Sequence, residues 1–325
     1  MNRRTERAPS QLLLQDPWRD SHRSGIQVFY VHDSRPWTVR DRTSWLLASP
    51  WGDSMKERDF HIPEFRASQV PPDPVAMREP DIGQPRESLR AIRTMVSADD
   101  LRVVFQPIVE LATGRPFACE ALVRCRLPEF QPPPRLFDQA VKLGCVGRLG
   151  RLIREIAVPL CSGVPLFLNV HPSELSEGWL VRPDDPIFSH DAEVYLEITE
   201  SVPMSHFGLC RSVLREVCSR GQFFLVIDDL GAGYSNLKRI ADLQPRMVKI
   251  DRGLVHGLDA NPRQQTLVRR VVRLCEDLEA FVVAEGIETA SEFSAVRDTG
   301  THFGQGFLLA RPAYPIPTVT LPPFP

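Results

Sequence analysis

No stretch of the 325-residue sequence approaches the roughly 18 continuous apolar residues that a membrane-spanning helix needs. The arginine-rich N-terminus has no apolar segment of the kind found in secretory signals. The sequence also has no large excess of charge of one sign, since its formal net charge is -2. This balance gives no indication of DNA binding. These absences predict a cytoplasmic protein without a membrane segment, in which local groups or metals hold any phosphate ligand.

Cysteine pairs of the C-x-x-C type are also absent, and the seven cysteines are odd in number. Both facts argue against a metal clip and against a disulfide framework. Most of the cysteines stand in apolar surroundings, where a free cysteine behaves as a small buried hydrophobic residue, and they indicate a reducing compartment. Their positions are Cys119, Cys125, Cys145, Cys161, Cys210, Cys218 and Cys275.

Residues 1–88 lack a sustained helical or strand period, and prolines interrupt them, most densely at residues 71–74. Four of the five tryptophans nevertheless lie in this segment, which is unusual for a solvated tail. They are Trp18, Trp37, Trp45 and Trp51. Three interpretations stay open: a disordered leader, a gene start placed upstream of the true Met, and a small partner-binding or sensory appendage. We therefore expect an irregular N-terminal extension over residues 1–88, largely disordered or of unknown fold.

From Glu87 onward the pattern changes to short apolar runs separated by amphipathic segments, which is typical of alternating strands and helices. Residues 261–278, for example, predict a helix whose apolar face holds Leu267, Val268, Val271, Val272 and Leu274. Eight strands with intervening helices favour a closed (β/α)8-type barrel over an open α/β sheet. We expect this domain over residues 89–316 and a short tail over 317–325. The expected strands are 103–108, 117–123, 165–170, 193–198, 223–227, 247–250, 281–284 and 303–308.

Charged or amide side chains stand at or just beyond the ends of nearly all of these strands. The C-termini of barrel strands meet at one face, so side chains far apart in sequence can form one polar cluster there. Singly, each has an ordinary explanation, such as a solvated glutamate or a turn. Their joint occurrence favours a functional cluster. The set is Glu120 in the second strand, Asn169 in the third, Glu197 in the fourth, Asp228 and Asp229 after the fifth, Lys249 in the sixth, Glu285 after the seventh and Gln305 in the eighth.

The five carboxylates, which share a common cavity with the Asn169 amide, repel one another by several kcal/mol unless they are protonated or bind cations. All the candidate ligands are oxygen donors without cysteine or histidine, which favours Mg²⁺ or Mn²⁺ over zinc. The adjacent pair Asp228 and Asp229 suits two metals roughly 3.5 to 4 Å apart, an arrangement used for in-line attack on phosphodiesters. The cluster therefore predicts a two-metal phosphodiesterase site.

Eight strings, in this order, resemble the EAL domain family of cyclic di-GMP phosphodiesterases. The resemblance implies a modified TIM barrel with one antiparallel strand and hydrolysis of cyclic di-GMP to linear pGpG with two Mg²⁺ or Mn²⁺ ions. It also implies a homodimer formed through the loop after the fifth strand. The strings are FQPIV (105–109), EALVR (120–124), FLNVHP (167–172), LEITES (196–201), DDLGAGYSNL (228–237), VKID (248–251), AEGIE (284–288) and QGFLLARP (305–312).

The resemblance further implies a role for each matching residue. Ligands of the first metal would be Glu120, Asn169, Glu197 and Asp228, with Asp228 bridging and Asp229 completing the second metal. Lys249 would orient the attacking water, Glu285 would lie beside the second metal and its water, and Gln305 would hold a catalytic water. Glu288 would support the loop after the fifth strand, while Gln106 and Arg124 would contact the substrate, Arg124 at a phosphate oxygen.

Four positions depart from the family pattern. Cys125 replaces an aromatic residue, Leu230 and Ala232 replace Phe and Thr in the loop that couples metals to the dimer interface, and His302 replaces an acidic residue. Turnover and dimer strength are the properties that these changes put in question. Because the acidic ligands are all kept, hydrolysis is favoured over two alternatives, a catalytically silent receptor for cyclic di-GMP and a protein-interaction module. No GGDEF-type string supports a linked cyclase domain.

Overall fold

The computed structural model describes residues 85–199, 207–231 and 237–322. The four tryptophans of the N-terminal extension lie outside these residues, as does Ala232. Helix α2 begins at Pro85, so the expected domain boundary at residue 88 falls inside a helix. None of the helices in the described part of the chain combines the length and the apolar character that spanning a bilayer requires.

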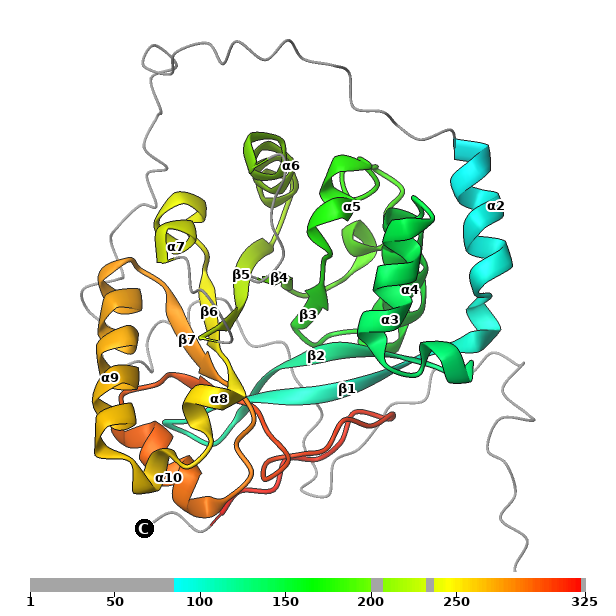
Figure 1. The fold of residues 1–325 in the computed structure, drawn as a ribbon. Coiled ribbons are helices and arrows are strands. Elements are labelled where there is room, and N and C mark those ends of the chain that lie inside the picture. Colours follow the sequence, from blue (N-terminus) through cyan, green and yellow to red (C-terminus); the bar gives the residue numbers. More distant parts are fainter. Residues whose placement is uncertain (1–84, 200–206, 232–236, 323–325) are drawn as a thin grey trace, which may run out of the picture. The chain divides into compact units, whose positions relative to one another are not determined.

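Eight strands close into a barrel in sequence order (Figure 1). Strand β1 runs antiparallel to both of its neighbours, β2 and β8, and the remaining neighbours are parallel. The expected barrel and its single antiparallel strand are therefore confirmed. The strands are β1 (Leu101–Glu110), β2 (Pro116–Cys125), β3 (Leu166–Asn169), β4 (Val194–Thr199), β5 (Phe223–Leu230), β6 (Met247–Ile250), β7 (Phe281–Ala284) and β8 (Phe303–Gly304).

Strand β8 is shorter than the expected 303–308, because the chain leaves the sheet after Gly304. The Gln305 N–H still donates to Ala284 at 2.8 Å, but the Gln305 carbonyl accepts from Ile287 at 3.1 Å and Leu308 donates to Ile287 at 3.0 Å. The backbone groups that would extend β8 are thus used by the loop after β7.

Helices cover the outside of the barrel, and α2 lies outside α4 (Figure 1). They are α2 (Pro85–Met95), α3 (Pro133–Lys142), α4 (Val146–Leu160), α5 (Pro172–Ser176), α6 (Phe207–Ser219), α7 (Leu237–Leu243), α8 (Arg252–Val255), α9 (Pro262–Asp277) and α10 (Ala290–Asp298). Short 3₁₀ turns lie at Ala98–Asp100, Pro128–Phe130, Pro186–Ser189 and Leu258–Ala260.

Helix α9 shows why a helix begins where it does. The Asn261 side chain accepts a hydrogen bond from the Gln264 N–H, and Pro262 occupies the first turn, where its missing N–H costs nothing. The expected apolar face is only partly right. Val268 and Val272 are buried, whereas Leu267 is 51% exposed and Leu274 36% exposed, because the buried stripe turns toward Cys275.

The interior of the barrel holds one layer of apolar side chains, with one residue from each strand. Three of its residues are aromatic: Phe167 stacks on Tyr195 at 4.4 Å between ring centroids, and the Phe303 ring lies 4.5 Å from that of Phe117, which packs against the layer. The layer closes the barrel, so it is a packed core and not a channel. Its members are Ile108, Ala118, Phe167, Tyr195, Val226, Met247, Val283 and Phe303. Outside the barrel wall, six of the seven cysteines are buried and all seven are free, as expected.

Candidate active site

A polar layer lies directly above the apolar layer. Side chains alternate across a strand, so a residue two positions along points to the same face. A polar residue stands two positions after each apolar residue of the interior layer in strands β2 to β8. In β1, which runs the other way, the polar residue stands two positions before it. The register then places Gln106 opposite Glu120, and Asn169 opposite Glu197. The polar layer consists of Gln106, Glu120, Asn169, Glu197, Asp228, Lys249, Glu285 and Gln305.

Lys249 lies at the centre of this layer and is 1% exposed. Its ammonium nitrogen is 2.5 Å from Oε1 of Glu285 and 2.7 Å from Oε1 of Glu197. Oε2 of Glu120 and Oδ1 of Asp228 are each 3.4 Å away. Burial lowers the pKa of Lys249, but the four carboxylates outweigh it and raise that pKa well above its ordinary value. The ammonium is therefore charged at any physiological pH.

Glu120 is held by three donors. Oε1 accepts from the Asn169 amide at 3.1 Å, and Oε2 accepts from the Gln305 amide at 2.8 Å and from Lys249 at 3.4 Å. Burial raises the pKa of Glu120, but Lys249, Gln305 and Asn169 together outweigh burial, so its pKa is lowered. Glu120 is consequently the carboxylate of the cluster that is most firmly ionised.

The other carboxylates show the opposite shift. Burial first, and the charge of Glu120 second, raise the pKa of Glu197 well above its ordinary value. Burial also raises the pKa of Asp228, and it raises the pKa of Glu285 to about 8 against the pull of Lys249. One ammonium does not neutralise four buried carboxylates, so without further cations the cluster binds protons.

The sequence predicted that the Asp228–Asp229 pair follows the fifth strand. In the structure both residues lie inside β5. Successive residues of a regular strand face opposite sides, which would separate the two carboxylates. The register between β5 and β6 shifts between Ile227 and Leu230, and Asp229 takes a left-handed backbone with φ of 63°. Ligand atoms of Asp228, Asp229 and Glu285 consequently lie within 4.8 Å of one another.

Gln305 is positioned by the loops after β7 and β8. Its amide nitrogen donates to Oε1 of Gln106 at 3.1 Å as well as to Glu120. The next residue, Gly306, passes so close to the Ile287 backbone that an added Cβ would lie 2.1 Å from the Ile287 carbonyl oxygen. Gln106 in turn donates to the Ala310 carbonyl at 3.0 Å. The EGIE and QGF segments thus fit together only with glycine at position 306.

Arg124 and Glu288 lie at the edge of the cluster. Arg124 is four residues beyond Glu120 on β2, and it donates to the Val123 carbonyl at 2.8 Å. The Glu288 carboxylate pairs with Arg252 at 3.0 Å. The backbone N–H of Glu288 donates to the carboxylate of Glu292, which is part of the N-terminal cap of α10. The loop that Glu288 is predicted to support lies largely outside the described residues.

Two of the residues that depart from the family pattern are core residues, Cys125 and Leu230. His302 immediately precedes β8, and its Nδ1 accepts a hydrogen bond from the Val282 N–H at 3.1 Å while its Nε2 is 3.5 Å from Glu276. Its ring contacts Phe281 edge-on at 5.1 Å between centroids. The His302 side chain thus joins β8 to β7 and α9.

Sequence reasoning missed a buried ionic network beside β3 and β4. Arg154 of α4 pairs with Glu174 of α5 at 2.6 Å and holds Asp185 with two nitrogens at 2.8 and 3.0 Å. All three side chains are at most 2% exposed. A signal was present, because Arg154 falls on the apolar stripe of α4 together with Gly150 and Ala157. The network connects α4 to α5, which follows the strand that carries Asn169.

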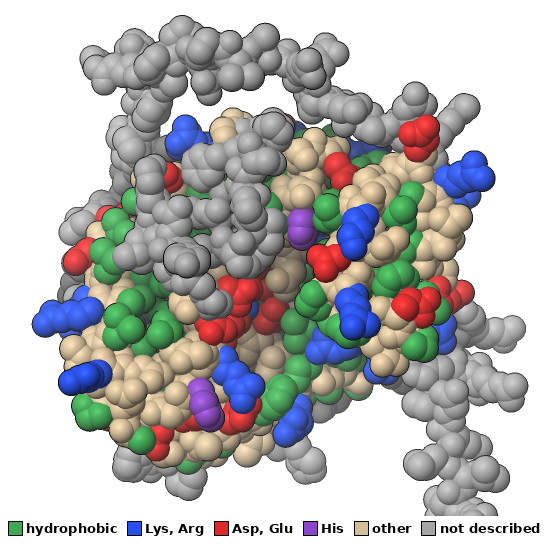
Figure 2. Space-filling view, in the orientation of Figure 1, with side chains coloured by type: hydrophobic (Ala, Val, Ile, Leu, Met, Phe, Trp, Pro, Cys, Tyr) green, Lys and Arg blue, Asp and Glu red, His purple; other side chains and the backbone are tan. Residues whose placement is uncertain are grey.

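The side-chain oxygen atoms of the polar layer are suitable ligands for divalent cations. Oε2 of Glu197 and Oε1 of Gln305 are buried and have no hydrogen-bond partner among the described residues. The donors are carboxylate and amide oxygens, the ligands of Mg²⁺ and Mn²⁺. Acidic side chains gather near the middle of the face in Figure 2, beside a hollow. The arrangement can bind cations next to a site open to a ligand.

Comparison with known families gives one family match. The EAL domain matches residues 89–312. A cyclic di-GMP phosphodiesterase of Pseudomonas aeruginosa is 31% identical over 230 residues, which cover 67% of this chain and 39% of the relative. Cyclic di-GMP phosphodiesterase PdeR of Escherichia coli is 29% identical over 68% of this chain and 35% of PdeR. The chain therefore spans well under half the length of these two relatives.

Solved structures agree with the sequence matches. Klebsiella pneumoniae BlrP1, in a manganese and cyclic di-GMP complex, superposes with a TM-score of 0.58 and 31% identity, over 67% of this chain and 57% of BlrP1. PaMucR phosphodiesterase with bound cyclic di-GMP gives a TM-score of 0.60 and 26% identity, over 70% of this chain and 97% of that one.

Proposed function

The chain belongs to the EAL domain family, and from this premise we propose that it hydrolyses cyclic di-GMP to linear pGpG, lowering the level of this second messenger. One observation carries the proposal: Glu120, Glu197, Asp228 and Glu285 all lie within 3.4 Å of Lys249, at the mouth of the barrel. Every acidic ligand expected from the family pattern is present.

Two divalent cations, Mg²⁺ or Mn²⁺, fit this cluster. Glu120, Asn169, Glu197 and Asp228 would hold the first, and Asp228 with Asp229 the second, with Glu285 beside it. When bound, such cations make a water more acidic and stabilise negative charge on the phosphoryl oxygens. The raised pKa values of Glu197, Asp228 and Glu285 support this assignment, because added positive charge would let these groups ionise.

Lys249 and Gln305 would act on the attacking water. The permanently charged Lys249 ammonium donates hydrogen bonds and so orients a water or stabilises charge that develops on it. Gln305 uses its amide N–H group on Glu120 and Gln106, which leaves Oε1, without a partner among the described residues, to accept a hydrogen bond from water. Both residues are fully enclosed, so their positions are fixed before substrate binds.

Gln106 and Arg124 would contact the substrate. The Arg124 guanidinium is half-buried and pairs with no carboxylate within the described residues. Burial, and then the charge of Arg102 opposite it on β1, lower the pKa of Arg124. The guanidinium nevertheless stays protonated at neutral pH. A phosphate oxygen of cyclic di-GMP is a suitable partner for such a group. We also propose a homodimer formed through the loop after β5, with Glu288 supporting that loop.

A receptor that binds cyclic di-GMP without cleaving it, or a protein-interaction module, is the alternative. One experiment separates the three functions. The purified chain is incubated with cyclic di-GMP and MgCl₂ or MnCl₂, and the products are separated by chromatography. Linear pGpG is expected. Binding without cleavage would favour the receptor, and the absence of both would favour the interaction module.

A further inference from the structure

Strands β1 and β2 are the longest of the barrel, with ten residues each (Figure 1). Their neighbours do not follow them to the mouth. Strand β3 pairs with β2 only as far as Ala121, and β8 pairs with β1 only at Val109 and Glu110. Residues 101–104 of β1 and 122–125 of β2, here called the hairpin end, therefore pair only with each other.

The two faces of the hairpin end differ in burial. One face packs into the apolar core outside the barrel, and its residues are Leu101, Val103, Val123 and Cys125. The opposite face continues the inner face of the barrel, because alternate residues of a strand share a face. None of its residues is buried, and they are Arg102, Val104, Leu122 and Arg124.

The register of β1 and β2 sets two arginines opposite each other above the acidic cluster. Gln106 lies opposite Glu120 in the polar layer, and four residues further toward the mouth Arg102 lies opposite Arg124. Four residues correspond to roughly 13 Å of strand, and flexible arginine side chains can span part of that distance. An apolar pair separates the two levels. The arginine pair therefore borders the space above the cluster.

The two guanidinium groups lie close enough to influence each other. Burial first, and then the charge of Arg102, lower the pKa of Arg124, while the charge of Glu120 acts in the opposite direction. Arg124 is thus within electrostatic reach of both the cluster and Arg102. Like charges directly opposite each other destabilise a pair of strands, and an anion held between them would offset this effect.

The Arg102 side chain is exposed and has no hydrogen bond or ion pair with any described residue. The carboxylate nearest to it in sequence is otherwise engaged. Asp100 accepts hydrogen bonds from the Ser97 N–H at 2.9 Å and from the Ser97 hydroxyl at 2.6 Å, and the arginine whose charge acts on it is Arg126. Arg102 is therefore available to a ligand.

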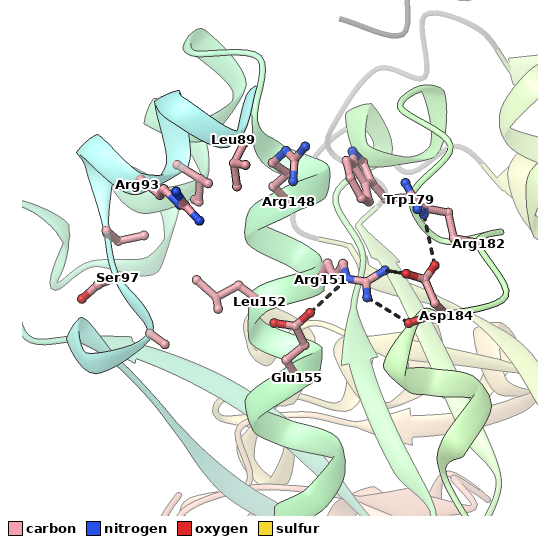
Figure 3. A pocket seen from close by; sticks show the side chains of 13 residues that line it. Leu89, Arg93, Ser97, Arg148, Arg151, Leu152, Glu155, Trp179, Arg182 and Asp184 are labelled. Carbon is pink, nitrogen blue, oxygen red and sulfur yellow. Dashed lines mark hydrogen bonds and ion pairs between the residues drawn. The ribbon is translucent and has the colours of Figure 1, made fainter. Parts of the chain in front are cut away.

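Arginines of the pocket between α2 and α4 give a contrast. Arg151 pairs with Glu155 at 3.0 Å and with Asp184 at 3.1 Å (Figure 3). Arg182 pairs with the same aspartate at 3.1 Å. None of the residues of the acidic cluster lines that pocket. Arg102 differs in both respects, because no carboxylate pairs with it and it stands on the inner face of the barrel strands.

We propose that Arg102, together with Arg124, binds the phosphate of cyclic di-GMP that does not lie at the acidic cluster. This inference rests on the proposed function and adds a substrate-binding residue outside the eight strings that carry the family resemblance. Cyclic di-GMP has two phosphates. Cations of the cluster neutralise the one that is cleaved, and the other needs a cationic partner. Two guanidinium groups offer forked donors that match phosphate oxygens.

The test is the steady-state kinetics of cyclic di-GMP hydrolysis by the full chain in MnCl₂. Arg102→Met should raise KM about tenfold, the effect of losing a hydrogen bond to a charged group. We expect kcat to stay within about twofold, because the phosphate that does not react is held equally before and during the reaction. Arg115→Met is the matched control, since Arg115 is an exposed arginine at the other end of the same hairpin. Its KM should equal that of the parent chain.

Arg102→Glu separates binding from a structural role. The variant places a carboxylate opposite Arg124, and opposite charges across a strand pair stabilise it. The midpoint of urea unfolding should therefore not fall below that of the parent chain. KM should nevertheless rise by a further factor of about three or more over Arg102→Met, because the carboxylate engages Arg124 and repels the phosphate. A merely structural residue would lose stability and kcat together.

An unchanged KM in Arg102→Met, or an equal rise in Arg115→Met, would overturn this inference and leave the proposed hydrolysis intact. If the parent chain binds cyclic di-GMP without cleaving it, the proposed hydrolysis fails. The same variants are then compared by calorimetric titration, where Arg102→Met should raise the Kd about tenfold and an unchanged Kd would contradict the role of Arg102. A chain that neither binds nor cleaves cyclic di-GMP would overturn both proposals.

Discussion

The ammonium nitrogen of Lys249 lies 2.5 Å from Oε1 of Glu285, the residue that follows β7, and the same nitrogen reaches carboxylates of β2, β4 and β5. One cation thus faces four carboxylates, which leaves three negative charges in excess. Burial raises the pKa of Glu285, and the neighbouring charges of Asp228 and Glu120 add to the rise. The excess of negative charge makes the cluster suitable for divalent cations.

Lys249→Met removes the ammonium from this cluster. The free energy of unfolding in EDTA should fall by about 3 to 5 kcal/mol, because buried carboxylates lose a paired charge. Urea unfolding measures it. MnCl₂ should restore part of the loss, while Lys142→Met, at an exposed lysine of α3, should change stability by under about 0.5 kcal/mol. Equal stability of the Lys249 variant and the parent would contradict the central role of Lys249.

Glu120→Gln keeps the size of the side chain and removes its charge. Affinity for Mn²⁺ should fall at least about tenfold, and hydrolysis of cyclic di-GMP at least about a hundredfold. Paramagnetic resonance of free Mn²⁺ measures the first, and chromatography of pGpG the second. Glu110→Gln, on the neighbouring strand, is the control and should change neither quantity. Unchanged hydrolysis in the Glu120 variant would show that the metal assignment is wrong.

Asp229→Gly separates strain from ligand function. With φ of 63°, Asp229 is in a region that favours glycine, so the variant should be more stable in EDTA by about 1 kcal/mol. It should nevertheless lose hydrolysis, because a carboxylate of the second cation site is gone.

Glu279→Gly is the matched control for that variant, since Glu279 is exposed and has φ of 61°. We expect a similar gain in stability with unchanged hydrolysis. Denaturant unfolding and product chromatography decide both points. A loss of stability in Asp229→Gly would show that the Asp229 side chain also stabilises the irregular part of β5, in addition to binding metal.

Gly306→Ala tests how Gln305 is positioned. The added Cβ would lie 2.1 Å from the Ile287 carbonyl oxygen, so the loops must separate. We expect a destabilisation of about 1 to 3 kcal/mol and at least a tenfold loss of hydrolysis. Gly208→Ala, where a Cβ would meet nothing within 4 Å, should preserve both properties. Full activity of the Gly306 variant would mean that Gln305 does not depend on this contact.

Glu174 predicts a pH dependence of stability. Burial raises its pKa to about 7 despite the Arg154 guanidinium, because one guanidinium faces two buried carboxylates. The folded chain therefore holds a proton that the unfolded chain releases between the ordinary carboxyl pKa of about 4.5 and pH 7. The contribution of Glu174 to the free energy of unfolding should fall by about 3 kcal/mol as pH rises through this window, then level off.

The acidic cluster contributes a slope of the same sign, because the pKa of Glu285 is also raised. In Glu174→Gln the slope should therefore become shallower by the contribution of Glu174, and Glu129→Gln, at an exposed glutamate, should retain the full slope. Urea unfolding between pH 4.5 and 8 provides the measurement. A parent chain whose stability rises through the same window would contradict the sign of the Glu174 shift.

Much of the fold and of the active site could be predicted because the relevant signals are local. Short apolar runs gave all eight strands, and β6 and β7 match their expected bounds residue for residue. The resemblance, and not the strand pattern, predicted that one strand is antiparallel. The face of α9 was misjudged at Leu267 and Leu274, because the sequence alone does not say how far an apolar stripe extends around a helix.

The sequence by itself determined which side chains share a strand face, since alternation places Glu120 with Ala118 and Lys249 with Met247 whatever surrounds them. Only the closed barrel decided that this face is the inner one and that Lys249 meets carboxylates from four other strand ends. The irregular register of β5 at Asp229 and the buried ionic network of Arg154 depend on contacts between distant segments. Such contacts follow from packing in three dimensions, which no local period of the sequence records.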